Sequence, residues 1–149
     1  MHILIDADAC PVKDEVYRVA RRYGLLVTLV ANSTMRIPSD ATFNLVIVPE
    51  GLDLADDWIA ANAGEGDIVI TADIPLAARC LLKGACVLGT TGKAFTEDNV
   101  GNALATRELM AGLRDAGTIT GGPAPFQKKD SSRFLQALDS IIQQIRRGS

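Results

Sequence analysis

The sequence is poor in the residues that serve as nucleophiles and soft metal ligands. It has one histidine, His2, and three cysteines, Cys10, Cys80 and Cys86, whose spacing fits no metal site. Cys10 has no neighbouring histidine, and it lacks the Cys-x5-Arg spacing of a cysteine phosphatase because Val16 occupies the arginine position. We therefore interpret Cys10 as a packing residue, and all three cysteines as reduced thiols of a cytosolic protein.

Long apolar runs are also missing. No stretch approaches the roughly 18–20 apolar residues of a membrane span, and the N-terminus lacks the basic and apolar regions of a signal peptide. With 149 residues, 48% hydrophobic content and 22% charged content, the chain suits one compact domain over residues 1–149. We expect a cytoplasmic protein without a membrane partner. The net charge of −3 does not by itself indicate a nucleic-acid binder, but net charge conceals local patches.

Aromatic residues make up only 5% of the chain, so no stacking platform for single-stranded nucleic acid is visible in the sequence. Glycine-rich phosphate loops are missing as well. No G-x-G-x-x-G follows the first expected strand, which argues against a dinucleotide site. Gly92-Lys93 does not form a phosphate-loop motif, because Val87 occupies the position of the first glycine and Ala94 that of the Ser or Thr.

Short apolar runs alternate with helical patterns along the chain. The runs predict strands at His2–Ile5, Leu25–Ala31, Leu45–Val48, Asp67–Thr71 and Ala85–Leu88. Helices are predicted at Val12–Tyr23, Leu54–Ala63, Pro75–Lys83, Ala103–Ala116 and Ser131–Arg147, and residues 120–125 are predicted to be loop. Thr96 and Ser131 are predicted N-caps. Because the strands contain nearly continuous apolar runs, we expect an α/β fold with a mostly parallel sheet of about five strands and helices on both faces.

Acidic residues follow three of the predicted strands, close to the start of each following helix. Asp6 and Asp8 follow the first strand, Asp53 and Asp56 follow the third, and Asp73 follows the fourth. Because the carboxyl ends of parallel strands share one edge, we predict that the acids from these three junctions lie close together. Converging carboxylates suit Mg²⁺ or Mn²⁺, which are hard cations that prefer oxygen ligands.

Each acid also has a purely structural interpretation. An Asp at the start of a helix is a common N-cap that complements the helix dipole, and Asp53 is a plausible cap of its helix. Asp6 and Asp8 are harder to explain in this way, because one cap suffices and two like charges this close repel unless a cation or a shared proton relieves them. Asp57 and Glu50 are interpreted as solvated.

The acidic segments closely resemble the YaiI/YqxD family of bacterial proteins. The matching segments are Asp6–Pro11, Gly51–Asp56, Gly66–Ala77, and, as a C-terminal signature, Thr120–Pro123 with Arg133-Phe134. That family in turn resembles the PIN-like nucleases, which use a parallel sheet and an acidic, metal-binding pocket to cleave phosphodiesters, usually in RNA. The resemblance implies a PIN-like domain in which Asp6, Asp53, Asp56 and Asp73 are pocket acids and hold Mg²⁺ or Mn²⁺, with Asp8 as a further candidate.

A nuclease with an acidic pocket also needs cations to hold the phosphate backbone. The candidates for substrate contacts are Arg36, Lys128, Lys129 and Arg133, which flank loops at the expected active edge, together with Thr71. We further predict that the loop at residues 121–123 folds back over the acidic pocket and brings Lys128, Lys129 and Arg133 to the substrate. Residues 89–92 follow the fifth strand at the same edge and either line the pocket or form a plain turn.

The predicted function is metal-dependent hydrolysis of phosphodiester bonds in nucleic acid, with RNA favoured over DNA. One alternative is a non-catalytic protein that keeps the pocket to bind a nucleotide or RNA. Another is a haloacid-dehalogenase-type phosphatase, which the pattern of Asp6 and Asp8 also resembles, with Asp6 as nucleophile and Asp8 as general acid. Two features argue against the phosphatase. Cys10 replaces the Thr that this fold has two residues after its second Asp, and the Asp73 segment lacks the paired metal-binding acids of that fold.

Overall fold

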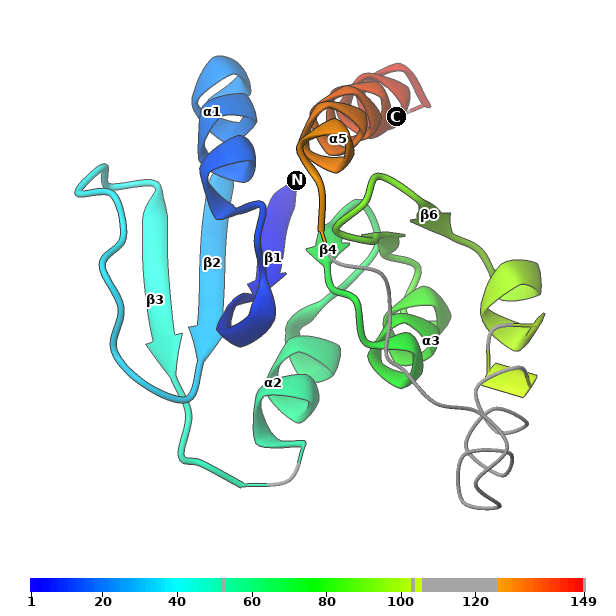
Figure 1. The fold of residues 1–149 in the computed structure, drawn as a ribbon, viewed down its shortest axis with the longest axis horizontal. Coiled ribbons are helices and arrows are strands. Elements are labelled where there is room, and N and C mark those ends of the chain that lie inside the picture. Colours follow the sequence, from blue (N-terminus) through cyan, green and yellow to red (C-terminus); the bar gives the residue numbers. More distant parts are fainter. Residues whose placement is uncertain (52, 103, 106–125, 149) are drawn as a thin grey trace.

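The computed structural model describes residues 1–51, 53–102, 104–105 and 126–148. Strands in these ranges form one sheet in the order β3-β2-β1-β4-β5-β6 (Figure 1). They are β1 (His2–Asp6), β2 (Leu26–Ala31), β3 (Phe43–Ile47), β4 (Ile68–Ile70), β5 (Cys86–Leu88) and β6 (Ala94–Phe95). The pairing is parallel from β3 to β5, and β6 is antiparallel to β5. The predicted mostly parallel α/β fold is confirmed, and β6 is an additional short strand.

The strand order creates a switch point between β1 and β4. From β1 the chain moves outward through β2 to β3, and it then returns to place β4 on the other side of β1. Ile3 accordingly pairs with Val27 of β2 on one side and with Ile68 of β4 on the other. In open α/β sheets, ligands bind outside the carboxyl ends of the strands at such a switch point. The ends of β1 and β4 are therefore the expected place for a site.

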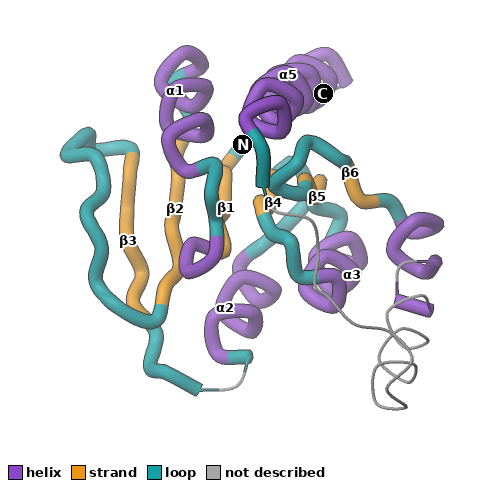
Figure 2. The backbone as a smooth tube through the Cα atoms, in the orientation of Figure 1, coloured by secondary structure: helices purple, strands orange, loops and turns teal. Residues whose placement is uncertain are grey.

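Helices cover both faces of the sheet because successive side chains of each strand point to opposite faces. Ile3 and Ile5 of β1 belong to the core shared with α1 (Lys13–Tyr23) and α5 (Lys128–Gly148). Leu4 belongs to the opposite core, shared with α2 (Leu54–Asn62) and α3 (Ile74–Leu82). A short 3-10 turn, η1 (Ala7–Ala9), follows β1 directly (Figure 2).

The last helix, α5, begins at Lys128, earlier than the sequence predicts. Ser131 lies within the helix and does not cap it; its hydroxyl donates a hydrogen bond of 3.0 Å to the carboxylate of Glu15 on α1. Phe134, Leu138 and Ile142 recur every fourth residue and are completely buried against the sheet. Burial of each of these side chains stabilises the fold by roughly 1.5–3 kcal/mol. The predicted final helix is thus confirmed, although it begins at a different residue.

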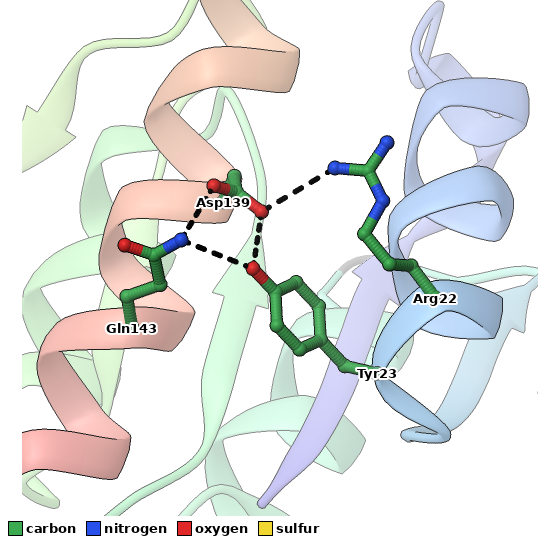
Figure 3. A network of polar contacts seen from close by, with 4 residues as sticks. All are labelled: Arg22, Tyr23, Asp139 and Gln143. Carbon is green, nitrogen blue, oxygen red and sulfur yellow. Dashed lines mark hydrogen bonds and ion pairs between the residues drawn. The ribbon is translucent and has the colours of Figure 1, made fainter.

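A polar network on the outer side of this packing connects α1 with α5 (Figure 3). The hydroxyl of Tyr23 donates to Asp139, and Gln143 donates to both, at 3.3 Å to the Tyr23 hydroxyl and 3.1 Å to the Asp139 carboxylate. The guanidinium of Arg22 lies 3.6 Å from the same carboxylate. These contacts fix the orientation of α5 relative to α1, and hence the position of its first turns.

Most predicted boundaries agree with the structure to within two residues. Thr96 caps a helical segment as predicted, since its hydroxyl accepts a hydrogen bond of 3.1 Å from the backbone N–H of Asn99. The predicted loop at residues 120–125 and most of the predicted helix Ala103–Ala116 lie outside the described residues. Within the described ranges, no helix is long and apolar enough to cross a membrane.

Candidate functional site

Asp6, Thr71 and Asp73 meet at the switch point of the sheet. Asp6 is the last residue of β1, and Thr71 follows the last residue of the neighbouring strand β4. The Thr71 hydroxyl donates a hydrogen bond of 3.0 Å to the Asp6 carboxylate and accepts one of 3.0 Å from the backbone N–H of Asp73. Thr71 is only 1% exposed. Although it was predicted as a substrate contact, its position suits a residue that orients Asp6.

Asp73 caps the helix that follows β4. Its backbone is extended, and its side chain accepts a hydrogen bond of 2.8 Å from the backbone N–H of Leu76 in the first turn of α3. Ile74 and Pro75 then begin the helix. Proline suits this position because it has no backbone N–H, and the first N–H groups of a helix have no acceptor within the helix. The structural interpretation of an acid as a cap is therefore correct for Asp73, and the cap also fixes its carboxylate near Asp6.

Asp56 brings a third junction to the same place, although it comes from α2. The pKa of Asp56 is raised to about 6, first by burial and then by the negative charges of Asp73, Asp6 and Asp53, while Arg79 lowers it. The pKa of Asp6 is also raised, first by burial and then by Asp73 and Asp8, against the hydrogen bond from Thr71. Carboxylates from all three predicted junctions are thus close enough to destabilise one another's charge.

Asp53 does not cap α2, contrary to the structural interpretation given to it from the sequence. It has a left-handed backbone with φ of 62°, and its side chain makes no capping hydrogen bond. Asp is one of the residue types that tolerate this conformation. The side chain of Asp53 is exposed, and its charge raises the pKa of Asp56.

Asp8 connects the end of β1 with the end of β2. Both of its carboxylate oxygens accept from the backbone N–H of Asn32, at 3.3 Å and 3.0 Å. Asn32 is the first residue after β2, so this contact completes the hydrogen bonding of the strand end. The side chain of Asp8 is exposed, and its charge still raises the pKa of Asp6.

The donor set fits a hard divalent cation. Asp6, Asp56 and Asp73 offer only carboxylate oxygens, and their mutual repulsion is the kind of charge imbalance that a cation relieves. Among the described residues, no three His, Cys, Asp or Glu side chains are arranged closely enough to ligate one ion together. This geometry is compatible with Mg²⁺, which keeps several waters and is usually held by one or two carboxylates.

Arg79 is a cation beside the acids that was not predicted from the sequence. Its guanidinium pairs with the Asp57 carboxylate at 2.8 Å, joining α3 to α2, and its charge lowers the pKa of Asp56. Asp57 is therefore exposed but paired, and not simply solvated. The pair joins residues 22 positions apart in the sequence, so only helix packing reveals it. Arg36 is exposed on the long loop between β2 and β3 (Figure 2).

A cavity of about 1120 Å³ lies next to the acidic group. Ala72, between Thr71 and Asp73, is part of its wall. The remaining wall comes from the turn between β5 and β6, including residues 89–93, and from the first turns of α5, including Lys129 and Arg133. Residues 89–92 thus line a cavity as well as forming a turn. Lys128 is exposed on the first turn of α5, and the loop predicted to close the pocket, at residues 121–123, lies outside the described residues.

Cys10 follows η1 and is buried near the acids. Its side chain is 7% exposed, and burial raises the pKa of its thiol above the ordinary value. A thiol with a raised pKa is a poor nucleophile at neutral pH. The interpretation of Cys10 as a packing residue agrees with this position.

We expect the metal-free protein to lose stability between about pH 4 and pH 6 through Asp56. Its ordinary pKa is 3.8 and its pKa in the folded protein is about 6, so in this range the folded state binds the proton more tightly than the unfolded state. Stability from this group is therefore present at low pH and falls as the pH rises. Melting temperatures in EDTA should fall less over this range in Asp56→Asn than in the wild type, and Mn²⁺ at pH 7 should stabilise the wild type more. Parallel curves for the two proteins would contradict the electrostatic coupling.

Comparison with known proteins places the chain among bacterial relatives. The family model described as "Uncharacterized BCR, YaiI/YqxD family" matches residues 4–144. A UPF0178 protein from Rhodospirillum rubrum is 59% identical over 149 residues, covering 99% of both chains. A UPF0178 protein from Paramagnetospirillum magneticum is 58% identical, covering 97% of this chain and 96% of its own. Another from Rhodospirillum centenum is 54% identical, covering 99% of both chains. No solved structure matches the chain significantly.

Proposed function

The chain belongs to the YaiI/YqxD family, and from the site in its structure we propose that it is a metal-dependent nuclease acting on RNA in the bacterial cytoplasm. The observation that carries the proposal is the convergence of Asp6, Asp56 and Asp73. They come from three separate strand-to-helix junctions, at the switch point where this type of sheet binds ligands. Free thiols at all three cysteines support the cytoplasmic location.

The raised pKa values argue that these acids are kept for function. Burial and the charges of neighbouring acids, Asp73 among them, raise the pKa of Asp6 and of Asp56, which is unfavourable for the metal-free fold, and of the three acids only Asp73 caps a helix. Strain of this kind is common at functional sites, where it is maintained at the expense of stability. If these acids served only to stabilise the fold, fewer negative charges at this place would stabilise it more.

Each residue of the site has a distinct part in the proposed reaction. Asp6 and Asp73 would hold Mg²⁺ or Mn²⁺, since Thr71 orients the first and the α3 cap fixes the second. When bound, such a cation lowers the pKa of a water molecule and stabilises charge on the phosphate. Asp56, with a pKa of about 6 in the metal-free protein, suits proton transfer near neutral pH. Asp53 and Asp8 would add negative charge that favours the cation.

The proposed substrate is a polyanion, so cations must offset its repulsion by the acids. Lys129 and Arg133 line the adjoining cavity, and Arg36 is exposed on the loop that follows β2. We propose that they contact phosphates of the substrate, with Lys128 as a further contact at the start of α5. RNA is favoured over DNA on the basis of the resemblance to PIN-like nucleases.

The test is cleavage of end-labelled single-stranded RNA by the purified protein with Mn²⁺, with Mg²⁺, and with EDTA. We expect cleavage that requires the metal and stops in EDTA. Single-stranded DNA of the same sequence serves as the comparison for substrate class. Tight binding of RNA that stays intact under all metal conditions would overturn the nuclease and favour a non-catalytic RNA-binding protein. Release of phosphate from monoesters alone would favour the phosphatase.

A further inference from the structure

The cavity beside the acids has a composition that the acidic site alone does not require. Lys93 comes from the turn before β6, and Lys129 and Arg133 come from α5, so two separate elements direct positive charge to one cavity. One carboxylate, Asp130, also lies in the wall, and it accepts a hydrogen bond of 2.9 Å from the backbone N–H of Gln127. The described wall therefore holds three cations against one acid, which favours an anionic ligand.

Aromatic surface lies in the same cavity. Phe95 of β6 and Phe126, just before α5, both contribute to the wall, and Phe126 is 39% exposed. An exposed aromatic ring beside cations is the combination by which proteins stack an unpaired base and hold its phosphate. The sequence does not indicate that these two rings line one cavity, because they are 31 positions apart.

Close contact between the two elements holds the cavity in shape. Gly92 has φ of 92°, and a Cβ placed on it would come within 2.8 Å of the carbonyl group of Arg133. The backbone of the β5–β6 turn therefore packs directly on the first turns of α5. Thr90 and Thr91 on this turn add hydroxyl groups to the wall. Such a wall offers hydrogen bonds at fixed positions to a polar ligand.

We propose that this cavity binds one nucleotide of a single-stranded nucleic acid, next to the phosphodiester that the acidic site would cleave. Lys129 and Arg133 hold the phosphate, and Phe126 stacks on the base. Only the position of the nucleotide next to the cleaved phosphodiester rests on the proposed nuclease function. Ala72, which is adjacent to Asp73, is part of the cavity wall, so a nucleotide in the cavity would lie beside the acids.

The dimensions favour an unpaired nucleotide over a duplex. At about 1120 Å³, the cavity is slightly larger than the roughly 300–1,000 Å³ that is usual for pockets binding small organic ligands, so it has room for one nucleotide. A base within a duplex is stacked on both faces and cannot enter such a cavity unless it is flipped out, which costs a few kcal/mol. The nuclease is therefore expected to act on single strands, loops or ends.

The first test is calorimetric titration of the metal-free full-length protein in EDTA with adenosine 5′-monophosphate. We expect saturable binding that weakens about tenfold in Arg133→Ala and in Lys129→Ala, as for the loss of a hydrogen bond to a charged group. Phe126→Ala should weaken nucleotide binding about tenfold and leave inorganic phosphate binding unchanged. Arg147→Ala is the matched control, because it removes an exposed arginine of the same helix outside the cavity and should change nothing.

A second test measures the binding of a short single-stranded RNA over a salt series. Each lost phosphate contact should reduce the slope of log affinity against log salt by roughly 0.7 to 1. Arg133→Ala and Lys129→Ala should show this reduction, and a duplex of the same length should bind at least about tenfold more weakly to the wild type. Circular dichroism of each variant confirms that the fold is retained.

The outcomes separate this inference from the proposed function. Absence of nucleotide binding by the wild type, unchanged affinity in both cation variants, or phosphate binding as tight as nucleotide binding would each overturn the nucleotide site, whether or not RNA is cleaved. Nucleotide binding with the expected variant effects, but without cleavage in any metal, would retain the site and refute the nuclease. Equal affinity for duplex and single strand would overturn the preference for unpaired nucleotides.

Discussion

Replacing Asp6 by Asn is expected to slow metal-dependent RNA cleavage by at least about 100-fold. The substitution keeps the size of the side chain and an oxygen that can accept the hydrogen bond from Thr71, so it removes little except the negative charge. Asp6 lies at the switch point between β1 and β4, where its charge interacts with Asp73 and Asp56. Losing one carboxylate of such a site removes a metal ligand or proton acceptor, and contributions of this kind are typically 10²–10⁴-fold.

The measurement is the single-turnover rate of cleavage of a labelled RNA in saturating Mn²⁺. Glu65→Gln is the matched control, because Glu65 is an exposed carboxylate in the turn before β4, at the opposite end of that strand from the site. Its rate should equal that of the wild type. The Asp6 variant should also retain its affinity for adenosine monophosphate in EDTA, which shows that the cavity is intact. A rate within a factor of three of the wild type would remove Asp6 from the proposed active site.

Replacing Gly92 by Ala is expected to destabilise the protein by about 2–4 kcal/mol, the largest effect on stability that we predict for a single methyl group. Two costs combine at this position. A φ of 92° is unfavourable for a residue with a side chain, and the new Cβ would lie 2.8 Å from the carbonyl carbon and oxygen of Arg133. Relief of the contact requires α5 or the β5–β6 turn to move, so nucleotide binding in the cavity should weaken as well.

Two control variants separate these costs. Gly24→Ala introduces a side chain at φ of 66° with nothing within 4 Å, so it should cost only about 1–2 kcal/mol from the backbone. Gly101→Ala lies in a helical segment, also with open space, and should be neutral or stabilise by up to about 1 kcal/mol. Free energies of unfolding come from urea titrations of the four proteins. Equal values for Gly92→Ala and Gly24→Ala would show that α5 does not pack on the turn as described.

The sequence by itself determined the architecture and the edge at which the acids meet. The strand His2–Ile5 and its counterparts are short and contain nearly continuous apolar runs. Such runs require that both faces of the sheet be covered, and that requirement in turn predicts a parallel sheet. In a parallel sheet, all carboxyl ends share one edge. Asp6, Asp56 and Asp73 follow separate strands, so their convergence could be predicted from the order of the elements alone, without any knowledge of side-chain packing.

Only the tertiary structure decided how each acid is held and what lies beside it. Asp53 adopts a left-handed backbone and caps nothing, whereas Asp73 is a true cap. Thr71 orients Asp6, and Arg79 reaches Asp57 across two helices. The cavity wall joins the β5–β6 turn to α5. Local patterns fix local conformation, but these contacts join residues that are far apart in the sequence, and their geometry depends on how the helices pack against the sheet.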